Sequence, residues 1–122
     1  WVLLQRGFGL RRLCLAGLES ECTIVDASLD LSESAAVIAG LDGVVTIDAW
    51  ACPAAGAQGV RTWVLAPRAL DARYENRERH SVHYPGIVTL ARQPACGDWR
   101  GAVRILSADL AQWLRERAGE TA

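Results

Sequence analysis

The residues best suited to chemistry follow a short β-branched run at positions 44–47. Asp48 comes directly after this run, a small-residue segment covers 51–58, and a second β-branched run covers 62–66. Apolar runs on either side of a helical segment predict a β-α-β unit in a parallel sheet. In such sheets, ligands bind beyond the carboxyl ends of the strands, where a helix amino terminus offers N–H groups to phosphate. We therefore expect a phosphate site at residues 48–53, with Asp48 orienting it or capping the turn.

Two further side chains could contact the same ligand. Gln5 follows the apolar run 1–4 and would lie at the carboxyl edge of the same sheet. Arg73 belongs to the polar stretch 68–80, which reads as a long surface excursion. An arginine can hold a diphosphate through two parallel hydrogen bonds. The alternative to a ligand contact, for both residues, is a solvent-exposed side chain without a binding role.

The cysteines and histidines indicate no metal site and no disulfide framework. Cys14, Cys22, Cys52 and Cys96 are scattered without C-x-x-C spacing. We expect three of the four to be small buried apolar residues. His80 and His83 flank Ser81, but catalytic triads are defined by geometry and not by such spacing, so we expect surface histidines. The sequence therefore predicts no catalytic residue, no metal and no cofactor.

Hydrophobic spacing predicts the elements around this site. Strands are expected at 1–4, 22–25, 44–47, 62–66 and 87–91, and a short helix or irregular crossover at 10–18. Ser32 is expected to cap a helix that ends near Leu41. Asp98 is expected to cap a helix over 99–117, whose apolar face would contain Val103, Leu106, Leu110, Trp113 and Leu114.

These elements predict an α/β fold with a mainly parallel sheet and flanking helices, Rossmann-like in organisation. We expect the strands that begin near Trp1, Val44, Thr62 and Ile87 to be parallel and to end at one common edge.

Composition excludes several classes of function. The chain has 122 residues, 51% of them hydrophobic, which suits one domain with a real core. Its formal net charge of −1 argues against a nucleic-acid-binding surface. There is no apolar run long enough to span a membrane and no signal pattern, so we expect a cytoplasmic protein. All 13 basic residues are arginine, which indicates a bacterial source, and the start at Trp1 without any methionine indicates a fragment.

The stretch from Asp30 to Asp48 resembles a run in the carboxyl-terminal half of bacterial glycosyltransferases. The group contains the ADP-heptose lipopolysaccharide heptosyltransferases and the tetratricopeptide-linked, O-GlcNAc-transferase-like proteins. Its motif Asp-Thr-Ala-x-Ala-His-Leu-Ala-Gly-Ala-Leu-Gly-x-Pro-x-Trp falls on 48–63, and Pro-x-x-Pro-Asp-Trp-Arg-Trp falls on 67–74. Ser-Pro-Trp-Tyr-Pro falls on 81–85. Arg-Gln-Pro-x-x-Gly-Asp-Trp is intact at 92–99.

The resemblance covers about residues 1–115 and implies part of a two-Rossmann-domain glycosyltransferase. Residues 1–122 would then be an incomplete carboxyl-terminal, nucleotide-sugar-binding domain, and the acceptor-side domain would be missing. The family's Asp-Thr-Ala-x-x-His turn meets the donor diphosphate, which implies donor contacts at Asp48, Ala49, Trp50 and Pro53. The family's Leu-Gln-x-Gly implies a nucleotide contact at Gln5. A UDP- or ADP-linked sugar is the implied partner.

The donor turn departs from the family pattern at three positions. The family threonine is Ala49 here, the family histidine is Pro53, and Trp50 replaces a small residue. These changes remove a hydroxyl donor, a side-chain donor and a backbone N–H. Two functions therefore remain open: the donor-binding half of an inverting glycosyltransferase, or a degenerate, non-catalytic relative that acts as a scaffold or interaction domain. An unrelated α/β domain that binds a small ligand is the third alternative.

Overall fold

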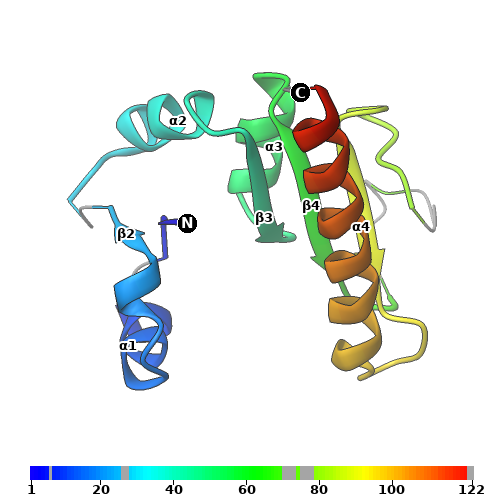
Figure 1. Ribbon diagram of the computed structural model, residues 1–122, viewed down its shortest axis with the longest axis horizontal. Helices are drawn as coiled ribbons and strands as arrows, with labels where there is room; N and C mark the ends of the chain where they lie inside the picture. Colours follow the sequence, from blue (N-terminus) through cyan, green and yellow to red (C-terminus); the bar gives the residue numbers. More distant parts are fainter. Residues whose placement is uncertain (6, 26–27, 70–73, 75–78, 121–122) are drawn as a thin grey trace. The chain divides into compact units, whose positions relative to one another are not determined.

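The computed structural model describes residues 1–5, 7–25, 28–69, 74 and 79–120 (Figure 1). Contacts between Cα atoms divide the chain into two units, Trp1–Val37 and Ile38–Ala122, and each is described by itself. The elements are β1 (Val2–Leu3), α1 (Gly7–Leu15), the 3₁₀ helix η1 (Glu19–Glu21), β2 (Thr23–Ile24), α2 (Leu31–Ala39), β3 (Gly43–Ile47), α3 (Ala51–Ala57), β4 (Arg61–Ala66), β5 (Val88–Arg92) and α4 (Trp99–Glu120).

The amino-terminal unit contains a two-stranded parallel sheet, in which Val2 pairs with Thr23 and Leu3 with Ile24. Several of its large apolar side chains stay exposed, Trp1, Phe8 and Leu15 among them. The prediction of a buried strand at residues 1–4 is therefore wrong. Two strands of two residues each offer too little surface to cover such side chains.

The helix α2 begins with a capping box, but not at the predicted residue. The Asp30 N–H donates to the Glu33 carboxylate, and the Glu33 N–H donates to the Asp30 carboxylate, both at 2.8 Å. This reciprocal pair satisfies two backbone donors that a helix start leaves open. Asp30 therefore takes the capping role predicted for Ser32, because the cap needs its partner three residues further on.

The larger unit is built on a three-stranded parallel sheet in the order β3-β4-β5. Val44 pairs with Thr62, and Val64 pairs with Leu90. The parallel pairing predicted for 44–47, 62–66 and 87–91 is confirmed, and these three strands end at one edge. The strand near Trp1 pairs instead with β2, in the amino-terminal unit.

Alternating residues of β4 bury the two faces of this sheet. Val64 and Ala66 pack with Val88 and Leu90 on the face that α3 covers. On the opposite face, Trp63 packs against Leu106 and Trp113 of α4. Figure 1 shows α4 running along β4 and β5. Continuous apolar strands of this kind are expected when helices cover both faces.

The strand β3 is less buried than predicted. Val44 is buried, but Val45 and Ile47 are exposed. Val45 is in register with Trp63, so it lies on the α4 face of the sheet. Because α4 packs mainly on β4 and β5, it leaves these two side chains of β3 uncovered.

Most of the apolar face predicted for α4 is confirmed. The Asp98 carboxylate accepts the Gly101 N–H at 2.8 Å, as expected for a capping residue. Leu106 is buried, and Leu110 and Trp113 are partly buried against the same cluster. Val103 and Leu114 were predicted on this face but are exposed. They lie at the margins of the apolar stripe, beyond the width of the two strands that α4 covers.

We expect Leu90→Ala to lower the free energy of unfolding by about 2–5 kcal/mol, because this fully buried side chain leaves a cavity between β5 and α3. Urea unfolding measures the change. The matched control is Leu114→Ala, at a position that is 55% exposed, for which we expect a change of about 0.5 kcal/mol or less. Equal losses for both variants would contradict the described core.

Candidate functional site

The candidate site is the turn between β3 and α3, at the carboxyl edge of the sheet. Asp48 and Ala49 are half-buried there, and Trp50 is the residue that precedes α3. The Trp50 backbone is already helical (φ −52°, ψ −29°) and its side chain caps nothing. Trp50 is 42% exposed, so its indole lies at the surface of this turn.

The first turn of α3 offers few free donors. The Cys52 N–H donates to the Ala49 carbonyl at 3.0 Å, and Pro53 has no N–H. Of the first three helical residues, only Ala51 retains an N–H without a bond among the described residues. A helix start binds anions through such groups. The turn therefore offers fewer N–H donors to a phosphate than a helix start whose first three N–H groups are all free.

Tyr74 reaches this turn from far along the chain. Its hydroxyl donates to a carboxylate oxygen of Asp48 at 2.9 Å and lies 3.8 Å from the Cys52 sulfur. The Tyr74 side chain is buried and packs with Cys52 in the core beside α3. This hydrogen bond fixes the Asp48 carboxylate and makes Tyr74 part of the site.

The surroundings of Tyr74 keep its hydroxyl protonated. Burial raises the pKa of the Tyr74 hydroxyl far above the ordinary value of 10.0, and the neighbouring Cys52 and Asp48 raise it further. A buried phenolate would lose hydration and would face the negative charge of Asp48. Tyr74 therefore acts here as a hydrogen-bond donor.

A second polar cluster lies where β4 and β5 end. The Gln93 side-chain oxygen accepts the Arg68 N–H at 3.1 Å and the Gly97 N–H at 3.2 Å. The buried Arg92 donates from Nε to the Arg68 carbonyl at 3.0 Å. These bonds join the segment after β4 to the segment that leads into α4.

The predicted site residues fall into three groups. Asp48, Ala49, Trp50 and Pro53 lie together on the turn, with Pro53 exposed. Gln5 is exposed in the amino-terminal unit, and its side chain lies against Gly9 at the start of α1. Arg73 lies outside the described residues.

Two side chains at this edge were not among the predicted contacts. Tyr74 gave no local signal, because its partner Asp48 is 26 residues away in the sequence. Gln93 belongs to the intact motif at 92–99, which could have drawn attention to it.

The predicted set of buried cysteines is wrong. Cys52 is buried, Cys22 is intermediate, and Cys14 and Cys96 are exposed. Cys14 lies on α1, which buries none of its own residues. Cys96 lies in the connection that precedes α4.

The described residues contain neither a metal-binding cluster nor a membrane-spanning helix. No group of three or more His, Cys, Asp or Glu side chains in this part of the chain could hold a metal ion. None of the helices in the same residues has the length and apolar character needed to cross a membrane.

Comparison with known proteins gave no match. No family model fits the chain, and neither the curated proteins nor the solved structures yielded a similar protein.

We expect Tyr74→Phe to lower the free energy of unfolding at pH 8 by about 1–2 kcal/mol, because the hydrogen bond to Asp48 is lost. The folded chain holds the phenolic proton more tightly than the unfolded chain. The contribution of Tyr74 is therefore complete below the unfolded pKa of about 10 and is lost as the pH rises above it. The difference between wild type and variant should shrink there, as measured by urea unfolding from pH 8 to pH 11.

The control for this series is Tyr84→Phe. The Tyr84 hydroxyl makes no hydrogen bond to the described residues, so we expect a change of about 0.5 kcal/mol or less at pH 8. A pH-independent difference for Tyr74→Phe would show that the phenolic proton is not held by the fold.

Proposed function

We propose that this chain is part of the donor-nucleotide-sugar-binding half of a glycosyltransferase-like protein, in which the turn 48–53 faces the donor diphosphate. The observation that carries the proposal is the parallel sheet β3-β4-β5, whose carboxyl edge includes this turn at the start of α3. Ligands of open α/β sheets bind beyond that edge. The resemblance of about residues 1–115 to the glycosyltransferase half supports the same location.

The role proposed for this half is to bind and position the donor nucleotide sugar. Asp48 would orient the turn or accept a ribose hydroxyl, and its hydrogen bond from Tyr74 holds one carboxylate oxygen in place. The Ala51 N–H is the backbone donor at the helix start that remains for a phosphate oxygen. The proposal assigns no general base to this chain, so an acceptor-side domain would have to supply it.

A second candidate is a non-catalytic relative in which the domain acts as a scaffold or interaction domain. The chemistry of the turn favours it, because Ala49 has no hydroxyl, Pro53 has no N–H and the Cys52 N–H is engaged. Each missing hydrogen bond to a charged phosphate forfeits about 1.5–3 kcal/mol. Two such losses weaken donor binding by at least about a hundredfold.

The double substitution Ala49→Thr with Pro53→His tests both candidates. It restores a hydroxyl, a side-chain donor and a backbone N–H at the turn, so we expect nucleoside diphosphates to bind about a hundredfold more tightly, or by about 3 kcal/mol. Calorimetric titration with UDP, ADP and GDP measures the gain. The control is Ala57→Thr, at the exposed carboxyl end of α3, which should change nothing.

The outcomes separate the candidates. Measurable binding by the wild type, strengthened in the double variant, supports the donor-binding half. Binding only in the double variant supports the non-catalytic relative. If neither the double variant nor a triple variant with Trp50→Ala gains affinity, the turn does not face a diphosphate and the proposal is wrong.

A further inference from the structure

A cavity of about 420 Å³ lies on the α4 face of the sheet, away from the candidate turn. Its lining comes from the amino-terminal halves of β4 and β5, from Arg79 and His80, and from the second half of α4. The turn 48–53 follows the carboxyl end of β3, so the cavity lies toward the other end of these parallel strands. Its volume falls in the range of small-molecule sites, about 300–1,000 Å³.

Trp113 gives the cavity an apolar wall, and the buried Trp63 supports it from the core. The rings of Trp63 and Trp113 meet edge to face, with centroids 5.0 Å apart and planes at 68°. Trp63 is fixed in the core at 1% exposure, and Trp113 is partly buried. The guanidinium carbon of Arg61 lies 5.3 Å from the centre of the Trp63 ring. A cationic group thus stands directly beside the apolar wall.

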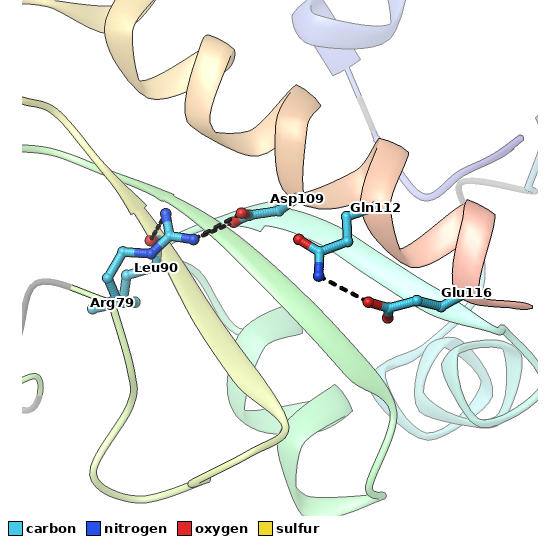
Figure 2. Close-up of polar contacts among 5 residues, drawn as sticks. All are labelled: Arg79, Leu90, Asp109, Gln112 and Glu116. Carbon is cyan, nitrogen blue, oxygen red and sulfur yellow. Dashed lines mark hydrogen bonds and ion pairs between the residues drawn. The ribbon is translucent and has the colours of Figure 1, made fainter.

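The ion pair between Arg79 and Asp109 forms another part of the lining and has no net charge. Figure 2 shows Arg79 donating twice to the Asp109 carboxylate, at 2.7 and 2.8 Å. Arg79 also contacts the Leu90 carbonyl at 3.5 Å. These bonds tie the segment before β5 to α4 and thereby shape the cavity. Because the two charges satisfy each other, neither is available to a ligand.

Two other charges in the lining lack a partner of opposite sign. Arg61 donates one hydrogen bond to the Gly86 carbonyl at 2.7 Å, but no carboxylate pairs with it within the part of the chain that the structure describes. Glu116 accepts only the Gln112 amide, at 2.8 Å (Figure 2), and pairs with no cation in the same residues. Both residues line the cavity, and they do not pair with each other.

The Arg61 end of the cavity also holds two unsatisfied donors. Among the described residues, the Arg61 Nε and the Trp63 Nε1 are buried and have no hydrogen-bond partner. Buried donors are nearly always paired, and an unpaired one costs about 1–3 kcal/mol. These two atoms are closed to solvent and therefore to a ligand, but the Arg61 guanidinium carries five N–H donors in all, and no carboxylate among the described residues pairs with it. This end of the cavity therefore favours a carboxylate.

We propose that this cavity binds a zwitterionic α-amino acid with an apolar side chain. The carboxylate lies on Arg61, the ammonium group faces Glu116, and the side chain packs against Trp113, which Trp63 supports from the core. Each charged group of the ligand thus meets the charge in the lining that has no partner, and the apolar part meets the aromatic wall. The proposal concerns binding alone and is independent of the function proposed for the turn 48–53.

Three probes that share one ring test the proposal by calorimetric titration of the full 122-residue chain. L-Phenylalanine carries both charges, phenylacetate carries only the carboxylate, and phenethylamine carries only the ammonium group. We expect phenylalanine to bind at least about tenfold more tightly than either of the others, because each lacks one charge-assisted hydrogen bond. The Trp63 indole N–H resonance should shift on binding of phenylalanine.

Charge-removing variants assign the two contacts. Glu116→Gln should weaken phenylalanine binding about tenfold and leave phenylacetate unaffected, whereas Arg61→Gln should weaken both. Glu116 is exposed, so its replacement leaves the fold intact, and circular dichroism checks the Arg61 variant. Arg115→Gln is the matched control, because Arg115 is exposed on α4 and outside the lining.

Several results would overturn the proposal. These are absence of phenylalanine binding up to its solubility limit, equal affinities for the three probes, and an unchanged phenylalanine affinity in Glu116→Gln. If phenylacetate binds more tightly than phenylalanine, the cavity takes a simple carboxylate and the role assigned to Glu116 is wrong.

Discussion

The burial of β4 on both faces is the constraint on which the Ile38–Ala122 unit depends. Thr62, Val64 and Ala66 are buried toward α3, while Trp63 is buried toward α4. A strand of this kind has no solvent-facing side, so both helices must pack for the sheet to be stable. The positions of α3 and α4, and of everything attached to them, follow from this one strand.

The same strand separates two possible sites. Beyond the carboxyl edge of the sheet lies the turn that carries Asp48, backed by the hydroxyl of Tyr74. Toward the amino end, on the α4 face, lies the cavity beside Arg61 and Trp63.

Long-range polar contacts lock the irregular segments onto this framework. Tyr74 bonds to Asp48 at the end of β3, Gln93 joins the end of β4 to the start of α4, and Arg79 joins the segment before β5 to Asp109 of α4. Three of these bonds link residues at least 25 positions apart, and the fourth joins Gln93 to Gly97 just before α4.

The amino-acid sequence by itself determined the type and order of most elements. Apolar runs at 44–47, 62–66 and 87–91, separated by turn signals, were enough to predict three parallel strands, since a right-handed helical crossover is the usual solution. The sequence also predicted the Asp98 cap and the apolar stripe of α4 through Leu106, because capping and helical spacing depend only on residues close in the sequence. The location of the candidate turn followed from the same local pattern.

Only the tertiary structure decided which side chains meet. It buried one cysteine where three were expected, and it exposed Ile47 at the edge of the sheet. It also brought Tyr74 to Asp48, and it left Arg61 and Glu116 unpaired in one cavity. Periodicity specifies the face on which a residue lies. It does not specify how far a neighbouring helix extends over that face or which distant residue arrives there.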